Sequence, residues 1–185
     1  MEQPLVVKQI RPTGSGVFEL VLERGEIAFQ PGDCLGLQGV ITADSRPYSI
    51  ASGTADDHLR FVIRHMPGGE VSEHLAGLRP GDVVRASPPF GWFRPGQGID
   101  GARFVFVATG TGIAPFLSHM RSHPGRPPAA VLWGVRRLAD AVDLAWIERR
   151  LPVELAVSRE NHPGRHHGRV TDLLDGLPRG PDCHY

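Results

Sequence analysis

A cation, an aromatic ring and two hydroxyl groups lie within one short stretch, Arg46-Pro47-Tyr48-Ser49-Ile50-Ala51-Ser52. In a β-strand, successive side chains alternate between faces, so Arg46 and Tyr48 share one face and Pro47 and Ser49 the other. The guanidinium suits a phosphate, the ring suits a flat partner, and the Ser49 hydroxyl can bond the edge of that partner. Pro47 has no N–H to donate, which favours an edge strand. The stretch is typical of a flavin-binding strand; an ordinary half-exposed strand is the alternative.

A glycine-rich segment, residues 108–115, follows the apolar run at 104–107. Gly110 and Gly112 permit a tight turn and the close approach of a phosphate, and Pro115 suits the first turn of a helix. Pro115 also replaces the last glycine of the usual dinucleotide fingerprint. A plain strand-to-helix turn is therefore the alternative to a phosphate site.

A second pair of glycines, Gly68 and Gly69, precedes a short expected helix that carries Ser72. Backbone donors at such a helix start can hold a pyrophosphate, with the Ser72 hydroxyl as a further partner. A simple helix N-cap is the alternative.

Three arginines follow apolar runs in the second half of the chain. Arg136 comes just after Trp133-Gly134-Val135, Ser158-Arg159 follow the next apolar run, and Arg169 lies ten residues beyond Arg159. The carboxyl ends of parallel strands form the ligand-binding edge of open α/β sheets, so these arginines favour a phosphate monoester. Glu160 weakens this interpretation, and solvated surface arginines are the alternative.

Other classes of function lack support. The formal net charge is zero, which gives no electrostatic footprint for nucleic acid or an anionic membrane. The two cysteines, Cys34 and Cys183, have no CxxC spacing, which argues against an iron-sulfur or structural zinc site. The loop with His162, His166 and His167 lacks the carboxylate-histidine spacing of a catalytic metal site, so no metal is expected. No Gly-x-Ser-x-Gly nucleophile elbow occurs, so a hydrolase is not supported. No signal peptide or apolar run of 18 residues occurs, and a cytoplasmic protein is expected.

Short runs bounded by Pro/Gly/Asp turns predict six strands and an antiparallel barrel in the first half of the chain. Val71, Leu75 and Leu78 recur at helical spacing and predict one short helix within it. The expected strands are Leu5–Ile10, Val17–Leu22, Asp33–Leu37, Arg46–Ala51, Leu59–Arg64 and Asp82–Ala86.

The Gly/Pro-rich stretch at 94–98 predicts a domain boundary near Asp100. Beyond it, continuous apolar runs alternate with helical segments, which is typical of buried parallel strands in an α/β domain. The expected order is strand Arg103–Ala108, helix Pro115–His123, strand Ala129–Trp133, helix Ala141–Arg150, strand Val153–Val157 and helix Val170–Leu174.

Five motifs in this order make the chain similar to the ferredoxin-NADP(H) reductase family of bacterial type. They are Arg46-Pro47-Tyr48-Ser49, Gly69-Glu70-Val71-Ser72, Gly110-Thr111-Gly112-Ile113-Ala114-Pro115, Gly134-Val135-Arg136 and Val157-Ser158-Arg159-Glu160. The resemblance implies a six-stranded antiparallel Greek-key FAD-binding barrel over residues 1–98 and a Rossmann-like parallel α/β NAD(P)-binding domain over residues 99–185.

The resemblance also implies site residues. Arg46 would pair with the FAD pyrophosphate, Tyr48 would stack on the isoalloxazine, Ser49 would bond flavin N5, and Thr111 would lie where flavin and nicotinamide meet. Tyr48, Ser49 and Thr111 are therefore the expected catalytic residues. The remaining FAD contacts would come from Pro47, Val62, Ile63, Arg64, His65, Glu70, Val71 and Ser72, and those to NADP(H) from Gly110, Gly112, Val135, Arg136, Ser158, Arg159 and Arg169.

By the same resemblance the protein would be an NADPH-dependent flavoprotein reductase. Hydride would pass between NADPH and flavin N5, and single electrons to or from a carrier such as ferredoxin, flavodoxin or an oxygenase component. An NADH-dependent oxygenase reductase and a redox-inactive flavin-binding module are the alternatives. A monomer is expected.

The sequence departs from the family at its end. Family members continue with a strand that carries a Cys-Gly pair, whereas this sequence ends at His184-Tyr185, about where that strand starts. We therefore expect a missing C-terminal segment, with Cys183 lying before the strand. Phe104 to Val107 would then form an exposed apolar sheet edge.

Overall fold

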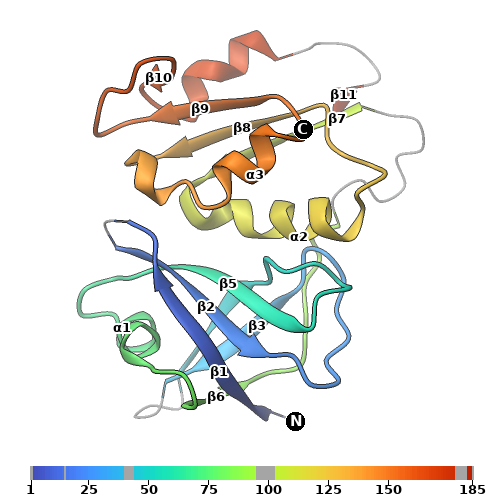
Figure 1. Ribbon diagram of the computed structural model, residues 1–185, viewed down its shortest axis with the longest axis vertical. Helices are drawn as coiled ribbons and strands as arrows, with labels where there is room; N and C mark the ends of the chain where they lie inside the picture. Colours follow the sequence, from blue (N-terminus) through green and yellow to red (C-terminus); the bar gives the residue numbers. More distant parts are fainter. Residues whose placement is uncertain (1, 15, 40–43, 95–102, 178–182, 185) are drawn as a thin grey trace. The chain divides into compact units, whose positions relative to one another are not determined.

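The computed structural model describes residues 2–14, 16–39, 44–94, 103–177 and 183–184, and the fold is given for these residues. The chain divides into two compact units, each built on its own sheet (Figure 1). The first unit comprises Met1–Pro95 with Ala114–Ser122, and the second comprises Gly96–Ile113 with His123–Tyr185. Each unit is described by itself.

The first unit contains the six predicted strands as an antiparallel barrel. They are β1 (Gln3–Pro12), β2 (Val17–Glu23), β3 (Cys34–Gln38), β4 (Ser45–Ser49), β5 (His58–Arg64) and β6 (Val83–Ala86). Their order in the sheet is β4-β3-β6-β1-β2-β5. Just beyond the end of β4, an antiparallel bridge between Ile50 and Phe61 and a bond from the Ala51 amide to the Arg60 carbonyl connect the two outermost strands, β4 and β5. The predicted barrel is confirmed.

Apolar side chains on the inner face hold this barrel together. Leu20, Leu35, Leu37 and Phe61 are fully buried in one cluster. Helix α1 (Glu70–Gly77) adds Val71 and Leu75 to that cluster, since residues four apart share a helix face. The predicted short helix is therefore confirmed, and its packing fixes its position on the barrel.

Two buried charges connect the middle of β2 to β5. Arg60 Nη2 makes an ion pair with Glu19 Oε1, and both side chains are only 9% exposed. Arg11 approaches the second carboxylate oxygen at 4.0 Å. A buried charge left without its partner is strongly unfavourable, so this pair locks the register of the two strands.

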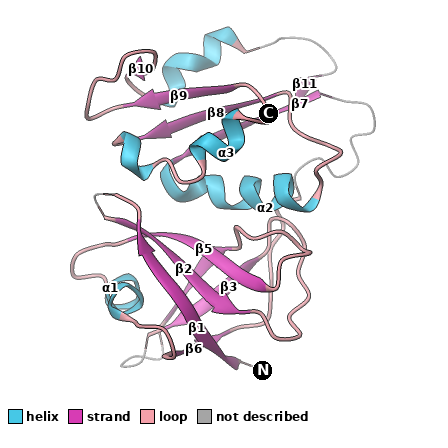
Figure 2. Ribbon diagram, viewed as in Figure 1, coloured by secondary structure: helices cyan, strands magenta, loops and turns pink. Residues whose placement is uncertain are grey.

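The second unit contains a parallel sheet with strand order β10-β9-β8-β7-β11 (Figure 2). Its strands are β7 (Arg103–Thr109), β8 (Ala130–Val135), β9 (Val153–Val157), β10 (His166–His167) and β11 (Cys183–His184). The helical segments are η1 (Gly110–Ile113), η2 (Leu138–Asp140), α3 (Leu144–Glu148) and η3 (Val170–Gly176). Val105, Leu132 and Val170 form a buried cluster between the sheet and η3. The Rossmann-like class is confirmed.

Helix α2 (Ala114–Ser122) follows η1 in sequence but packs with the barrel unit. The Thr54 amide donates to Ser122 Oγ at 2.9 Å. The rings of Phe93 and Phe116 meet edge to face, with centroids 5.4 Å apart. A contact-based division thus assigns α2 to the first unit, although the sequence order places it after the first parallel strand.

Two predicted helices differ from the structure. The helix expected at Ala141–Arg150 is limited to α3, because Asp143 before it adopts a left-handed conformation with φ of 58°. The helix expected at Val170–Leu174 is the 3₁₀ segment η3, which runs to Gly176. Both errors concern helix length and type rather than the order of elements.

The expected exposed edge is also corrected. Cys183 begins strand β11 rather than preceding it, and it pairs in parallel with Arg103 while His184 pairs with Phe104. The side chains of Phe104, Val105 and Phe106 are buried, each at most 8% exposed. Strand β11 thus pairs with this edge at Arg103 and Phe104, and Val107 is the one partly exposed side chain of the run from Phe104 to Val107.

The predicted boundary near Asp100 falls in residues 95–102, outside the described residues. The division into domains 1–98 and 99–185 therefore stays a prediction. Across the described residues, no helix has the length and apolar character needed to cross a membrane.

Candidate functional site

Strand β4 places the Arg46-Pro47-Tyr48-Ser49 motif at one edge of the barrel sheet. The edge position predicted from Pro47 is confirmed, since β4 pairs only with β3 in the sheet order. The Arg46 side chain is 61% exposed, and Nη2 lies 3.6 Å from Asp44 Oδ2. A weak, exposed ion pair of this kind is readily exchanged for a phosphate.

Tyr48 is half-buried against the barrel core. It lies opposite Leu35 in the β3–β4 register, two positions from the pair between Leu37 and Arg46 and on the same face of the strand. Burial raises the pKa of the Tyr48 hydroxyl, and the nearby Arg46 charge opposes that rise. The ring is therefore neutral near pH 7 and held as a flat surface beside the guanidinium.

Ser49 is held on the face opposite to Tyr48 by its neighbour on β3. Cys34 lies directly across from Ser49, and the Cys34 Sγ and Ser49 Oγ atoms are 3.4 Å apart. Such a contact with sulfur is weak, so the hydroxyl keeps its capacity to bond a stronger partner.

The opposite edge of the sheet is β5, which carries Val62, Ile63 and Arg64. Beyond the Ile50–Phe61 bridge and the bond from Ala51 N–H to the Arg60 carbonyl, β4 and β5 are no longer paired with each other. Unpaired strand edges present N–H and C=O groups to any molecule that lies along them. The predicted FAD residues of β4 and β5 therefore flank the same split in the barrel.

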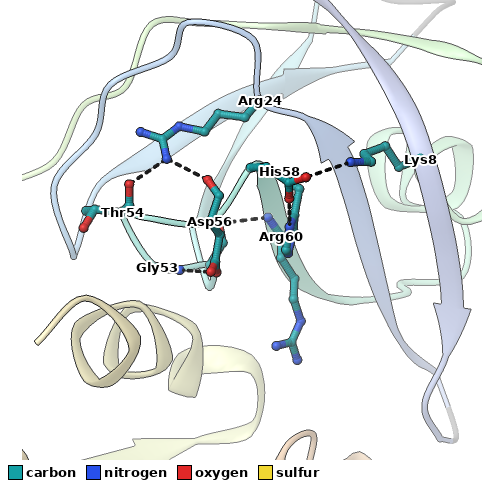
Figure 3. Close-up of polar contacts among 9 residues, drawn as sticks. Lys8, Arg24, Gly53, Thr54, Asp56, His58 and Arg60 are labelled. Carbon is teal, nitrogen blue, oxygen red and sulfur yellow. Dashed lines mark hydrogen bonds and ion pairs between the residues drawn. The ribbon is translucent and has the colours of Figure 1, made fainter. Parts of the chain in front are cut away.

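The loop from β4 to β5 is fixed by Arg24, which the sequence analysis did not single out. Its Nη1 donates to the carbonyls of Thr54 and Asp56, both at 2.7 Å (Figure 3). Its Nε donates to the Ile27 carbonyl. Within the loop, the Gly53 amide donates to Asp56 Oδ2 at 2.7 Å. One arginine thus orders the connection between the two edges that flank the split.

Helix α1 begins close to the end of β5. Its N-cap, Gly69, makes no side-chain capping bond, which leaves the amides of Glu70, Val71 and Ser72 for another acceptor. Ser72 Oγ instead accepts from the Met66 amide at 3.1 Å. His65, which joins β5 to this segment, donates its amide to the Gly16 carbonyl. The Gly68 amide donates to Glu73 Oε2 at 2.9 Å, so a pyrophosphate at this helix start stays a prediction.

The glycine turn of the second unit is held by a hydrogen bond from a buried tryptophan of the neighbouring strand β8. Gly110, Thr111 and Gly112 form η1, and buried Trp133 donates its indole N–H to the Gly110 carbonyl at 2.9 Å. Gly110 has a φ of 51°, which favours glycine. A Cβ atom at Gly112 would meet nothing within 4 Å, so this position leaves open space above the turn.

The carboxyl edge of the parallel sheet brings Arg136 and Arg159 together, although they are far apart in sequence. The Arg159 amide donates to the Arg136 carbonyl at 2.9 Å, and the Ser158 amide donates to the Val135 carbonyl at 3.0 Å. Both arginines are exposed, and neither guanidinium contacts an acid among the described residues. Guanidinium groups are suited to bind an anion, and the expected phosphate site at these strand ends stays a prediction.

Glu160 does not neutralise this pair, contrary to the concern raised by its position in the sequence. Its Oε1 accepts from the Leu138 amide at 2.6 Å and lies 2.8 Å from His162 Nε2. Its Oε2 lies 3.6 Å from Arg137 Nη1. These contacts, the Leu138 bond first, lower the pKa of Glu160.

The histidine-rich loop between β9 and η3 is tied to nearby acids and carbonyls. His166 Nε2 lies 3.0 Å from Asp172 Oδ2, and His167 Nδ1 lies 3.1 Å from the Glu160 carbonyl. Arg169 is exposed just before η3, and its amide donates to Asp172. The structure shows Arg169 at the same end of the sheet, but no contact that joins it to Arg136 or Arg159.

The residues present fit a flavin dinucleotide. An exposed arginine, a half-buried tyrosine, two open strand edges and an uncapped helix start all belong to the barrel unit. These supply a cation for phosphate, a plate for a ring system and amide donors for oxygen atoms. The individual contacts to FAD stay predictions.

The sequence matches a family and several characterised proteins. A family model named "oxidoreductase FAD-binding domain" matches residues 8–94. The chain is 37% identical over 131 residues to ferredoxin-NADP reductase B of Sorangium cellulosum, covering 67% of this chain and 53% of that protein. It is 32% identical over 133 residues to the toluate 1,2-dioxygenase electron transfer component of Pseudomonas putida, covering 66% of this chain and 37% of that protein.

A solved structure agrees with this likeness. The chain superposes on a cytochrome P450 reductase from Amycolatopsis with a TM-score of 0.84 at 27% identity, covering 98% of this chain and 60% of that one. The chain thus spans about half the length or less of the two relatives named above. The FAD-binding barrel, the parallel sheet and the ordered motifs, together with these similarities, support a reductase of the ferredoxin-NADP(H) reductase family.

Proposed function

We propose that this protein is an FAD-dependent reductase that takes hydride from NADPH and passes single electrons to a small carrier protein. FAD supplies the redox chemistry when bound, accepting hydride and releasing electrons one at a time. The partner is a ferredoxin, a flavodoxin or an oxygenase component. The monomeric state and cytoplasmic location stay predictions.

The roles of the barrel residues follow from where the fold holds them. Arg46 neutralises phosphate charge at the open β4 edge, and Tyr48 presents a neutral ring that excludes water from the face it covers. Ser49 offers a hydroxyl donor at the end of the same strand. Their shared strand sets the spacing of all three groups, so the site is formed before the cofactor arrives.

The observation that favours NADPH over NADH is the pair Arg136 and Arg159. Their guanidinium groups lie on adjoining strand ends without an acidic partner among the described residues, and Ser158 beside them adds a hydroxyl. Two charge-assisted hydrogen bonds to a 2′-phosphate predict a preference of about 10²- to 10⁴-fold.

Anaerobic rapid mixing tests the proposal. The FAD-loaded 185-residue chain is mixed with NADPH or NADH, and loss of the visible flavin absorbance is followed at several nucleotide concentrations. We expect bleaching with NADPH at far lower concentration than with NADH. Bound flavin that neither nucleotide reduces would contradict reductase activity of this chain and favour a flavin-binding module.

An NADH-dependent reductase component of an oxygenase is the second candidate. It is supported by the similarity to the Pseudomonas putida electron transfer component. An enzyme selective for NADH is expected to place an acid against the adenosine ribose, where this chain has Ser158 and Arg159. Equal rates with the two nucleotides at low concentration would favour this candidate.

A further inference from the structure

We propose that Glu160 is a positioning residue that holds Arg136 and Arg159 side by side for a 2′-phosphate. The inference rests on the proposed NADP(H) site. The negative charge of Glu160 by itself would weaken phosphate binding, whereas the proposed positioning role strengthens it.

The contacts of Glu160 join two loops. Leu138, whose amide donates to Glu160 Oε1 at 2.6 Å, lies two residues beyond Arg136 in the loop after β8. Glu160 itself is the residue next to Arg159 in the loop after β9. The carboxylate therefore joins the loop after β8 to the loop after β9 by a hydrogen bond, just beyond the ends of these strands.

This link extends a ladder that the strands begin. The last bonds between the segments run from Ser158 N–H to the Val135 carbonyl and from Arg159 N–H to the Arg136 carbonyl. Beyond them the chains would be free to separate, and two like charges on neighbouring ends would favour separation. The Glu160–Leu138 bond is the next connection along, and it opposes that repulsion.

The remaining contacts direct the carboxylate away from the arginine pair. Oε1 lies 2.8 Å from His162 Nε2, and Oε2 lies 3.6 Å from Arg137 Nη1. The His167 ring nitrogen meets the Glu160 backbone carbonyl at 3.1 Å, which fixes the backbone at the same point. Both carboxylate oxygens are thus occupied by groups other than Arg136 and Arg159.

Charge and position predict opposite effects of substitution, which makes the inference testable. If Glu160 acted only as a negative charge, removing that charge would strengthen binding of a phosphate dianion, and moving it would change little. If Glu160 acts through the Leu138 bond, shortening its side chain weakens binding although the charge stays. Glu160→Asp keeps the charge, but its shorter side chain no longer reaches the Leu138 amide. Glu160→Gln loses the charge and keeps an oxygen that can accept from that amide.

The test measures binding of 2′-phospho-AMP and of AMP to the 185-residue chain by isothermal titration calorimetry, so no flavin reaction is needed. We expect Glu160→Asp to weaken 2′-phospho-AMP binding by about three- to tenfold and to leave AMP unchanged. Glu160→Gln should bind 2′-phospho-AMP as well as the wild type or better. Glu154→Gln is the control, since Glu154 is an exposed acid of β9 and the charge change is the same.

Hydrogen exchange of the Leu138 amide gives a second measurement. Exchange should be faster in Glu160→Asp than in Glu160→Gln, because only the aspartate fails to reach that amide. Wild-type binding of 2′-phospho-AMP by Glu160→Asp, or equal losses for AMP and 2′-phospho-AMP, would overturn the inference. A wild-type chain that does not distinguish 2′-phospho-AMP from AMP would instead overturn the proposed NADP(H) preference, and this inference with it.

Discussion

The two proposed phosphate sites, at the edge of the barrel and at the edge of the parallel sheet, place arginine by different means. Arg46, Tyr48 and Ser49 lie within four residues on one strand, and strand alternation alone orients them. Arg136 and Arg159 lie in separate loops and become neighbours only through the parallel register of β8 and β9. The first site can be recognised in a short stretch of sequence, whereas the second depends on the topology of a whole sheet.

The largest expected effect is on the stability of the barrel that carries Arg46, Tyr48 and Ser49. Glu19→Gln leaves buried Arg60 without its ionic partner, which should lower the free energy of unfolding by about 3–5 kcal/mol. Chemical denaturation followed by tryptophan fluorescence and circular dichroism measures this loss. Glu23→Gln, at the exposed end of the same strand, is the control and should change stability little. Equal stability of the two variants would show that the buried pair contributes nothing.

The next effect separates the arginine pair of the sheet from the cofactor site of the barrel. Arg136→Ala or Arg159→Ala should weaken binding of NADPH by about 10- to 100-fold, because each removes a charge-assisted contact to the 2′-phosphate. Binding of NADH should not change, and steady-state KM values for both nucleotides measure the difference. Arg149→Ala removes an exposed arginine at the end of α3 and serves as the control. Losses of similar size for NADH would argue against a role at the 2′-phosphate.

Arg46→Ala should have the opposite profile. We expect FAD to bind about tenfold or more weakly, since a single charge-assisted bond to phosphate is lost. The ratio of NADPH to NADH affinity should stay constant in the protein saturated with FAD. Fluorescence titration of the apoprotein with FAD measures the first effect, with Arg85→Ala on exposed β6 as the control. A changed nucleotide preference would contradict the separation of the two sites.

A smaller effect concerns Arg24, whose bonds to the Thr54 and Asp56 carbonyls clamp the loop between β4 and β5. Arg24→Met removes bonds to three carbonyls and should lower the free energy of unfolding by about 1–2 kcal/mol. It should also speed amide exchange at Gly53 and Thr54. Arg79→Met, at an exposed turn before β6, is the matched control. Unchanged exchange in the loop would show that the clamp is not needed for order there.

The smallest effect is the pH dependence of the Glu160 link. The pKa of Glu160 is lowered first by the Leu138 amide and then by His162. A carboxyl group with a lowered pKa in the folded state stabilises that state above its ordinary pKa, and the contribution is lost as pH falls through the lowered value. An NMR titration of the Glu160 carboxyl should therefore give a midpoint below that of an unstructured peptide. His162→Gln should move the midpoint part of the way back, and an ordinary midpoint in the wild type would contradict the link.

The same contrast explains what the sequence analysis found and missed. Six short strands, the Arg46 motif and the glycine turn were predicted because each depends on neighbours in sequence. Arg24 was missed because its partners, Thr54 and Asp56, lie about thirty residues away and are backbone carbonyls that any residue would supply. Glu160 was judged by its position next to Arg159, whereas its side chain is bonded to Leu138.

The other errors share a physical cause. The helix at Ala141–Arg150 has the apolar spacing of a longer helix, but the left-handed conformation of Asp143 limits it to α3. Cys183 was placed before a strand, yet pairing with Arg103 makes it the first residue of β11. Both outcomes depend on backbone pairing and conformation that local residue patterns do not specify.

The sequence by itself determined the order of the longer strands and helices, the strand that carries the arginine, tyrosine and serine, and the chemistry that those groups can perform. Alternation along a strand and the conformational limits of glycine and proline are local properties, so they can be inferred without the fold. Only the tertiary structure decided that β4 and β5 separate beyond one bridge and that Arg136 lies beside Arg159 while Glu160 bonds elsewhere. Those facts depend on which distant segments pair, and pairing is set by the packing of the whole core.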